Sequence, residues 1–237
     1  MQRRTVAVVT GDVNASTRML EEDARRLEHV LNTCFQDVVS ALADAKAAGF
    51  TNFRGDSWQF VIGDPGMAVR ATLFFRSSLL VHSNQEFGKR IHTSASIGFG
   101  SIKYMPSETS LAGGGKAYEY SGKRLDKLRR RVPGMGVAGL GEIDLFMDSL
   151  LGVVDALAHH WTALQAQAVS FALQGLAQVE IAKKWNPPIS QQAVHKHLLS
   201  AGWPAIEPAL RWMETTLKGC IAENNPERLS EGETHER

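Results

Sequence analysis

Hydrophobic and polar positions follow two different periods over the first 140 or so residues, and this mixture predicts an α+β region. Short β-rich runs predict strands, and apolar residues three or four apart predict helices between them. The first run stops at Gly11-Asp12, which predicts a tight turn. The expected strands are 5–10, 91–102 and 134–139, with a hairpin of arms 50–54 and 57–62 around Gly55-Asp56, and the expected helices are 19–48, 67–81 and 115–131.

The order of these elements is strand, helix, strand, strand, helix, strand, helix, strand. This order predicts a ferredoxin-like α+β fold with an antiparallel sheet. After Gly141 the strand signal almost disappears, and helical patterns follow one another. We therefore predict an α+β domain of residues 1–141, an all-α domain of residues 142–222 and a polar, disordered tail of residues 223–237.

Three short helical patterns between Trp161 and Leu217 predict a helix-turn-helix module. A first helix shows one apolar face and ends at Gly175, and a second covers about 179–185. Asn186-Pro187-Pro188 must end the second helix, because proline lacks the amide donor that a helix interior needs. Ser190 is a good N-cap for a third helix over 191–201.

The third helix has the two faces of a recognition helix. Val194 and Leu198 form an inward, apolar face, and polar residues form the outward face. Glutamine can pair with adenine, and lysine with guanine or phosphate. The stretch 177–198 also resembles the helix-turn-helix of many bacterial regulators, with Pro187-Pro188 as an insertion in the turn. The alternative is a plain three-helix bundle used for dimerisation. We predict double-stranded DNA binding through Ser190, Gln191, Gln192, His195 and Lys196.

Composition changes this picture little. Hydrophobic residues make up 43% of the chain and charged residues 22%, which is typical of a globular protein. The formal net charge is +1, so affinity for nucleic acid must come from a local patch, and a dimer would strengthen it. No apolar run reaches membrane-spanning length, and the basic start leads into a strand. We expect a cytoplasmic protein with no membrane contact.

Two aspartates are the candidate metal-binding residues of the first domain. Asp12 follows the first predicted strand, and Asp56 lies at the tip of the hairpin, two places that the predicted topology makes adjacent. Two carboxylates there could hold Mg²⁺ or Mn²⁺, which would bridge the phosphates of a nucleotide. The alternative is that each is an ordinary turn residue after glycine.

The segments around these aspartates resemble the metal-binding segments of class III adenylate and guanylate cyclases. The resemblance rests on residues 10–17 (TGDVNAST), 54–60 (RGDSWQF), 97–100 (IGFG) and 116–125 (KAYEYSGKRL). With a C-terminal helix-turn-helix, the chain also resembles the SatD-like family of small bacterial proteins. The cyclase resemblance implies a homodimer, a nucleoside triphosphate ligand and metal ligation by Asp12 and Asp56.

The same resemblance assigns further residues. Arg124 falls where the cyclase transition-state arginine stands, and Asn14, Arg54, Lys116 and Lys123 are the expected nucleotide contacts. Two positions depart from the family pattern. Tyr120 replaces the catalytic asparagine, and Asn52 replaces the purine-selecting lysine. Losing such a donor can cost about 10²–10³ in rate, so the departures count against a full cyclase.

Three functions compete on this sequence. The first is a DNA-binding, transcriptional regulator whose cyclase-like domain senses a nucleotide. The alternative is a nucleotidyl cyclase or related phosphoryl-transfer enzyme with an accessory helix-turn-helix. The third is a structural dimer without ligand. The sequence favours the first, because its strongest motif is the helix-turn-helix.

Overall fold

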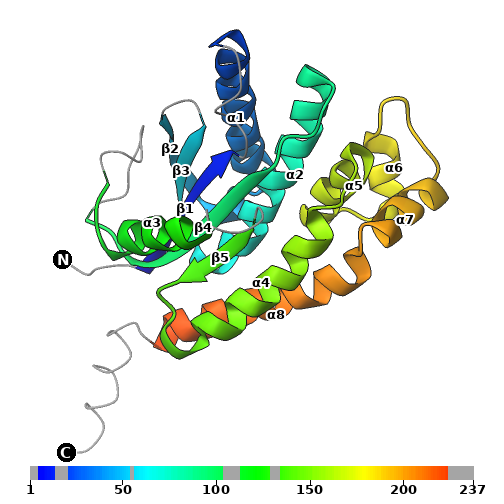
Figure 1. Ribbon diagram of the computed structural model, residues 1–237. Helices are drawn as coiled ribbons and strands as arrows, with labels where there is room; N and C mark the ends of the chain where they lie inside the picture. Colours follow the sequence, from blue (N-terminus) through cyan, green and yellow to red (C-terminus); the bar gives the residue numbers. More distant parts are fainter. Residues whose placement is uncertain (1–4, 14–20, 54–55, 104–112, 129–133, 224–237) are drawn as a thin grey trace, which may run out of the picture.

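A computed structural model describes residues 5–13, 21–53, 56–103, 113–128 and 134–223 (Figure 1). The predicted contacts Asn14 and Arg54 and the tail from residue 224 lie outside these residues. Within them, no helix is both long enough and apolar enough to cross a membrane. Both the cytoplasmic location and the division of the chain at residue 141 stay predictions.

A five-stranded sheet forms the centre of the first region. Its order is β2-β3-β1-β4-β5, with β1 antiparallel to both β3 and β4. This is the ferredoxin-like order of four strands, β2-β3-β1-β4, with the predicted fifth strand, β5, added at the edge. That added strand corrects the expected all-antiparallel sheet, because β5 pairs parallel to β4 after a helical crossover. The strands are β1 (Thr5–Val13), β2 (Ala47–Phe53), β3 (Ser57–Ile62), β4 (Thr93–Ser101) and β5 (Met135–Ala138).

The expected turn at Gly11-Asp12 is wrong, because β1 runs straight through both residues to Val13. Glycine is required at position 11 because the neighbouring strand leaves no room for a side chain. A Cβ on it would lie 2.1 Å from the indole of Trp58, its partner on β3. Any side chain at this position would therefore displace a fully buried tryptophan.

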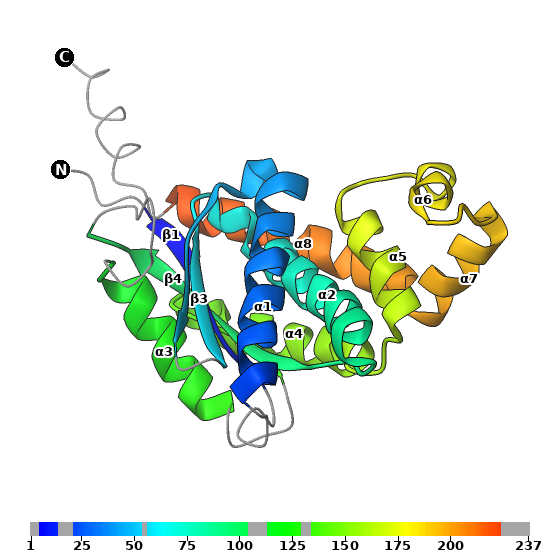
Figure 2. The ribbon, with the colours of Figure 1, turned by 90° about the horizontal axis from the view of Figure 1, so that it is seen from above.

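Two helices cover one face of the sheet, α1 (Glu21–Ala41) and α2 (Ala68–Phe87), and their apolar sides pack on Trp58, Phe60 and Ile62 (Figure 2). The expected helix over 19–48 is too long at its C-terminal end. A short 3₁₀ turn, Ala43–Ala45, follows α1, and Lys46 takes a left-handed backbone with φ of 52°. Ala47 then begins β2 by pairing with Ile62.

The opposite face of the sheet carries α3 (Lys116–Leu128), so the sheet is the middle layer of three (Figure 2). This helix lies very close to β4. A Cβ on Gly98 would meet the backbone oxygen of Ala117 at 2.2 Å and the nitrogen of Ser121 at 2.4 Å. The glycines of β4 therefore set the distance between α3 and the sheet.

The rest of the described chain is helical. Its helices are α4 (Asp144–Ala158), α5 (Ala163–Leu173), α6 (Gln178–Lys184), α7 (Gln191–Ser200) and α8 (Trp203–Glu223). The three helices of the predicted helix-turn-helix form where the sequence places them. Their hydrophobic core, however, is continuous with that of the sheet and its helices. In addition, Arg70 Nε of α2 donates a hydrogen bond to Glu214 Oε1 of α8 at 2.6 Å. A separate helix-turn-helix domain is therefore not confirmed.

Candidate functional site

The two predicted metal ligands lie together at one end of the sheet. Ser57, the first residue of β3, connects them. Its Oγ lies 2.7 Å from Asp12 Oδ1 and 3.5 Å from Asp56 Oδ1. The backbone amide of Val13 also donates to the carbonyl of Asp56 at 2.9 Å. Because all three side chains are only partly buried, the pair of carboxylates is accessible from solvent.

Buried groups on the far side of the sheet fix the backbone of Asp12. Trp58 Nε1 donates to Thr93 Oγ1 at 2.9 Å. The Thr93 hydroxyl lies 2.9 Å from the carbonyl oxygen of Asp12 and donates to it. Trp58 and Thr93 are almost completely buried, so this chain of hydrogen bonds is rigid. These bonds hold the backbone of Asp12 and do not use its carboxylate.

A row of polar side chains continues from the carboxylates beneath α3. Gln59 Nε2 donates to Thr10 Oγ1 at 2.6 Å, and the Thr10 and Ser121 hydroxyls lie 2.9 Å apart. Ser96 Oγ is buried and has no hydrogen-bond partner among the described residues. The bonded groups Gln59, Thr10 and Ser121 satisfy hydroxyls that would be costly to bury alone, and they tie α3 to β1 and β3 at a defined register.

The structure does not bring Arg124 to the two aspartates. Its guanidinium pairs with both carboxylate oxygens of Asp148 on α4. It also lies over Gly136 of β5, where a Cβ would be 2.6 Å from Nε. Strand β5 is two strands away from β1, roughly 10 Å at the usual spacing. Asp148 in turn accepts from the amide of Val137 at 2.8 Å, which fixes the pair to β5.

The other predicted nucleotide contacts on α3 are occupied elsewhere. Lys116 Nζ and Lys123 Nζ both bind Glu119, at 3.1 and 2.6 Å, on the exposed side of the helix. Tyr120, at the position of the cyclase asparagine, packs against Gly139 after β5. The amide of Asn52 is buried and lacks a partner in the described part of the chain. Among the predicted metal and nucleotide contacts that the structure describes, Asp12 and Asp56 lie together, and Arg124, Lys116 and Lys123 pair with other residues.

The predicted DNA contacts lie where the helical pattern places them. Ser190 Oγ accepts from the amide of Ala193 at 3.2 Å and caps α7. Val194 and Leu198 are buried, whereas Gln191, Gln192, His195 and Lys196 are exposed. The connection from α6 holds a cis peptide bond between Asn186 and Pro187. The face of α7 is therefore polar and accessible to a partner.

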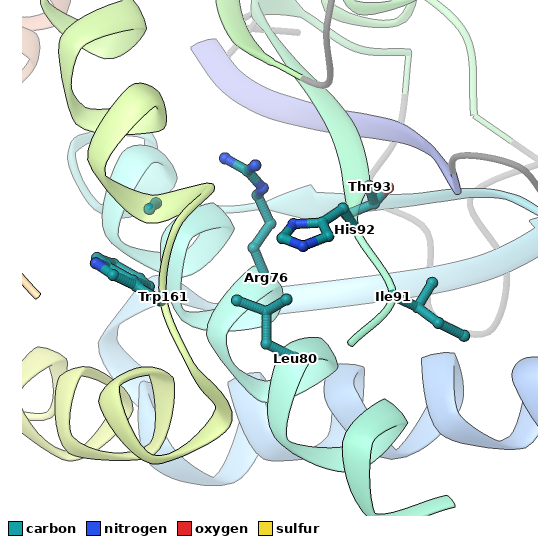
Figure 3. A pocket seen from close by; sticks show the side chains of 7 residues that line it. Arg76, Leu80, Ile91, His92, Thr93 and Trp161 are labelled. Carbon is teal, nitrogen blue, oxygen red and sulfur yellow. The ribbon is translucent and has the colours of Figure 1, made fainter. Parts of the chain in front are cut away.

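A small buried cavity of about 10 Å³ lies where the sheet meets α4 (Figure 3). Arg76 and His92 lie on its wall, and the ring of His92 is 4.6 Å from that of His159. Burial lowers the pKa of His92 to about 4, and the charges of His159, Arg76 and Arg90 act in the same direction. His92 is therefore neutral in the folded protein near pH 7.

We expect the free energy of unfolding to fall as pH drops from about 6.5 to about 4. In this window the unfolded chain protonates His92 and the folded protein does not, so each proton bound favours unfolding. His92 is only partly buried, which limits the loss to about 1–2 kcal/mol. Urea unfolding of wild type and His92→Gln at pH 7 and pH 5 measures it. Equal pH dependence in the two proteins would contradict the assignment.

Oxygen ligands suit a hard divalent cation, and the carboxylates of Asp12 and Asp56 with the Ser57 hydroxyl form such a donor set. No group of three or more histidine, cysteine or acidic side chains with metal-binding geometry occurs among the residues described. A cation here would therefore keep several ligands from water or from substrate phosphates, as Mg²⁺ commonly does.

No protein-family model matches this chain, and neither does any curated protein. Several solved structures of nucleotidyl cyclases match part of this chain. The guanylyl cyclase Cya2 is 17% identical over 52% of this chain and 73% of its own, with a TM-score of 0.36. A bacterial light-regulated adenylyl cyclase is 20% identical (58% and 77%, TM-score 0.37). The adenylyl cyclase CyaB from P. aeruginosa is 14% identical (58% and 78%, TM-score 0.41). At these TM-scores the candidate site rests on its own geometry.

The sequence missed the residues that position the site. Ser57 follows Asp56 directly, and its place opposite Asp12 on β3 could have been found from the strand register. Thr93 is different, because it is 81 residues from Asp12 and no local pattern marks it. Only the pairing of β1 with β4 brings the two together.

Proposed function

We propose that this chain binds a nucleoside triphosphate with Mg²⁺ or Mn²⁺ at Asp12 and Asp56, and that it is a nucleotidyl cyclase or a related phosphoryl-transfer enzyme. The observation that carries the proposal is the pair of accessible carboxylates joined by Ser57. The ferredoxin-like strand order, which brings the end of β1 beside the β2–β3 hairpin, supports it.

In this proposal Asp12 and Asp56 would hold the cation, and a bound cation would supply charge neutralisation and Lewis-acid polarisation of the phosphate. Ser57 donates a hydrogen bond that orients the Asp12 carboxylate. Thr93 and Trp58 keep the strand backbone fixed, so that the ligand geometry is preorganised. Tyr120 has no carboxamide to offer a ribose, which favours a reaction related to cyclisation over a full cyclase activity.

A homodimer belongs to the same proposal, because Arg124 is held by Asp148 away from the carboxylates of its own chain. An exposed apolar face on α4 supports it. Leu145, Phe146 and Val153 keep 78%, 58% and 62% of their surface exposed, and Phe146 contacts Trp212 of α8 edge to face. Apolar surface of this kind commonly marks an interface with another protein.

The test is a thermal-shift screen of the full chain with each nucleoside triphosphate, with and without Mg²⁺ or Mn²⁺. The proposal expects stabilisation that requires the metal, because a ligand stabilises the folded state it binds. Chromatography of the same mixtures then identifies any cyclic or transferred product. If no triphosphate stabilises the chain or is converted in the presence of either metal, the proposal is wrong.

DNA binding by α7 is a second proposed function, and the exposed polar set on that helix favours it. We expect the double variant Gln192→Ala/Lys196→Ala to lose duplex DNA affinity, because it removes one base contact and one phosphate contact. The loss should be about tenfold or more in a binding titration at low salt. Unchanged affinity in the double variant would remove α7 from consideration.

A further inference from the structure

A second cavity lies on the opposite side of the sheet from Asp12 and Asp56. It measures about 290 Å³ and has α2 as its floor and α1 and α5 as its walls. Figures 1 and 2 both show α2 between the other two helices. Small-ligand pockets usually measure roughly 300–1,000 Å³, so this cleft has room for a ligand of one or two rings.

The lining is unusual for a place where three helices converge. Helices that pack together normally present apolar stripes to one another. Here each helix presents polar, mostly uncharged side chains at helical spacing, above a floor that includes Phe74. The polar lining residues are Asp37 and Ser40 of α1, Ser78, His82 and Gln85 of α2, and Gln167, Ser170 and Gln174 of α5.

Asp37 is the one carboxylate in the described part of this lining, and two neighbours hold it in place. Ser78 Oγ donates to its Oδ2 at 2.5 Å, and His82 Nε2 lies 2.8 Å from the same oxygen. Burial acts to raise the pKa of Asp37, but these hydrogen bonds outweigh it and lower the pKa. The side chain still exposes 38% of its surface, which leaves Oδ1 room for another donor.

We propose that this cleft binds a nucleobase or nucleoside that carries an exocyclic amino group. A carboxamide offers a donor and an acceptor side by side, which matches the edge of a nitrogen heterocycle. Gln167 and Gln174 provide two such groups on one wall, although Gln174 Nε2 also donates to the backbone carbonyl of Ser170 at 3.1 Å. The Asp37 carboxylate on the α1 wall is an acceptor for an amino group. Phe74 and Phe171 supply apolar surface for the ring.

The charge of the lining distinguishes the ligand proposed for this cleft from the nucleoside triphosphate proposed for the Asp12–Asp56 site. Among the residues that the structure describes, the cleft lining has one carboxylate and neither lysine nor arginine. A phosphate group would therefore meet repulsion from Asp37, and the one imidazole of the described lining, His82, is already bonded to that carboxylate. The site should accept the uncharged base or nucleoside and discriminate against its phosphorylated forms. Helices α1 and α2 also pack on the strands that carry Asp12 and Asp56. A ligand in the cleft would therefore contact the helices that cover the opposite face of that sheet.

Calorimetric titration of the full chain tests this with adenosine, guanosine, cytidine and uridine, their free bases and their 5′-monophosphates. EDTA in the buffer keeps the Asp12–Asp56 site without metal, so failure of the proposed enzyme function leaves this test unaffected. We expect binding of at least one amino-bearing nucleoside or its base, and weaker binding of uridine and of the monophosphate.

Gln167→Leu and Gln174→Leu keep the side-chain volume and remove the carboxamide. Each should weaken binding about tenfold, the effect of about one hydrogen bond. Gln36→Leu, at an exposed position of α1 outside the cleft lining, is the matched control and should bind as wild type does. Thermal unfolding shows that each variant folds. The proposal is overturned if no base or nucleoside binds at millimolar concentration, or if both cleft variants bind as tightly as the control.

Discussion

Replacing Asp12 by Asn should abolish the metal-dependent stabilisation by nucleoside triphosphates and lower any turnover by at least about a hundredfold. Asn has nearly the same shape as Asp but no negative charge, so one of the two carboxylates that attract the cation is lost. The fold should survive. Thr93 contacts the carbonyl oxygen of Asp12 and not its side chain, so that hydrogen bond is kept in the variant.

Two further variants make this result specific. Ser57→Ala removes the hydroxyl between the carboxylates and should raise the metal concentration needed for half-maximal effect about tenfold, with less effect at saturating metal. Asp44→Asn changes an exposed carboxylate outside the site and should have no effect. The assignment fails if Asp12→Asn keeps the metal-dependent stabilisation of wild type.

The sequence predicted the elements of the fold better than it predicted their ends. Periodicity located the strands and most helices, because burial of one side of an element leaves a repeating pattern. It placed a turn at Gly11-Asp12 where the strand continues. That error has a physical cause, since the glycine is required by the indole of Trp58 on another strand, 47 positions away. A local pattern cannot distinguish a glycine that bends the chain from one that makes space.

The difference between local patterns and tertiary packing also explains which residues of the candidate site were predicted. Asp12 and Asp56 were predicted together because strand order alone makes them neighbours. The partner of Arg124 was not predictable, because Asp148 lies on a helix whose position depends on packing against β5. The cleft of Asp37 and Gln167 was missed for a related reason. Its walls come from both sides of the predicted boundary at residue 141, and only the packing of α5 on α2 brings them together.

The contact between Arg76 of α2 and Asp155 of α4 should be one of the most sensitive to mutation. The two side chains are 7% and 10% exposed, and Arg76 Nη1 lies 2.5 Å from Asp155 Oδ1. It is a close ionic contact, although neither atom meets hydrogen-bond geometry within the described chain. We expect Asp155→Ala to lower the free energy of unfolding by about 3–5 kcal/mol, because it leaves a buried guanidinium without its counter-charge. Urea unfolding at pH 7 measures this loss.

Two comparisons distinguish loss of the counter-charge from loss of packing. The double variant Arg76→Met/Asp155→Leu removes both charges and keeps apolar volume, so it should recover most of the stability that Asp155→Ala loses. Glu207→Ala breaks the Arg211–Glu207 pair, whose arginine side chain is 71% exposed, and should cost no more than about 1 kcal/mol. If Asp155→Ala costs no more than Glu207→Ala, the buried pair does not hold α4 against α2. A double variant as unstable as Asp155→Ala would instead show that packing around these residues, and not the unpaired charge, determines the loss.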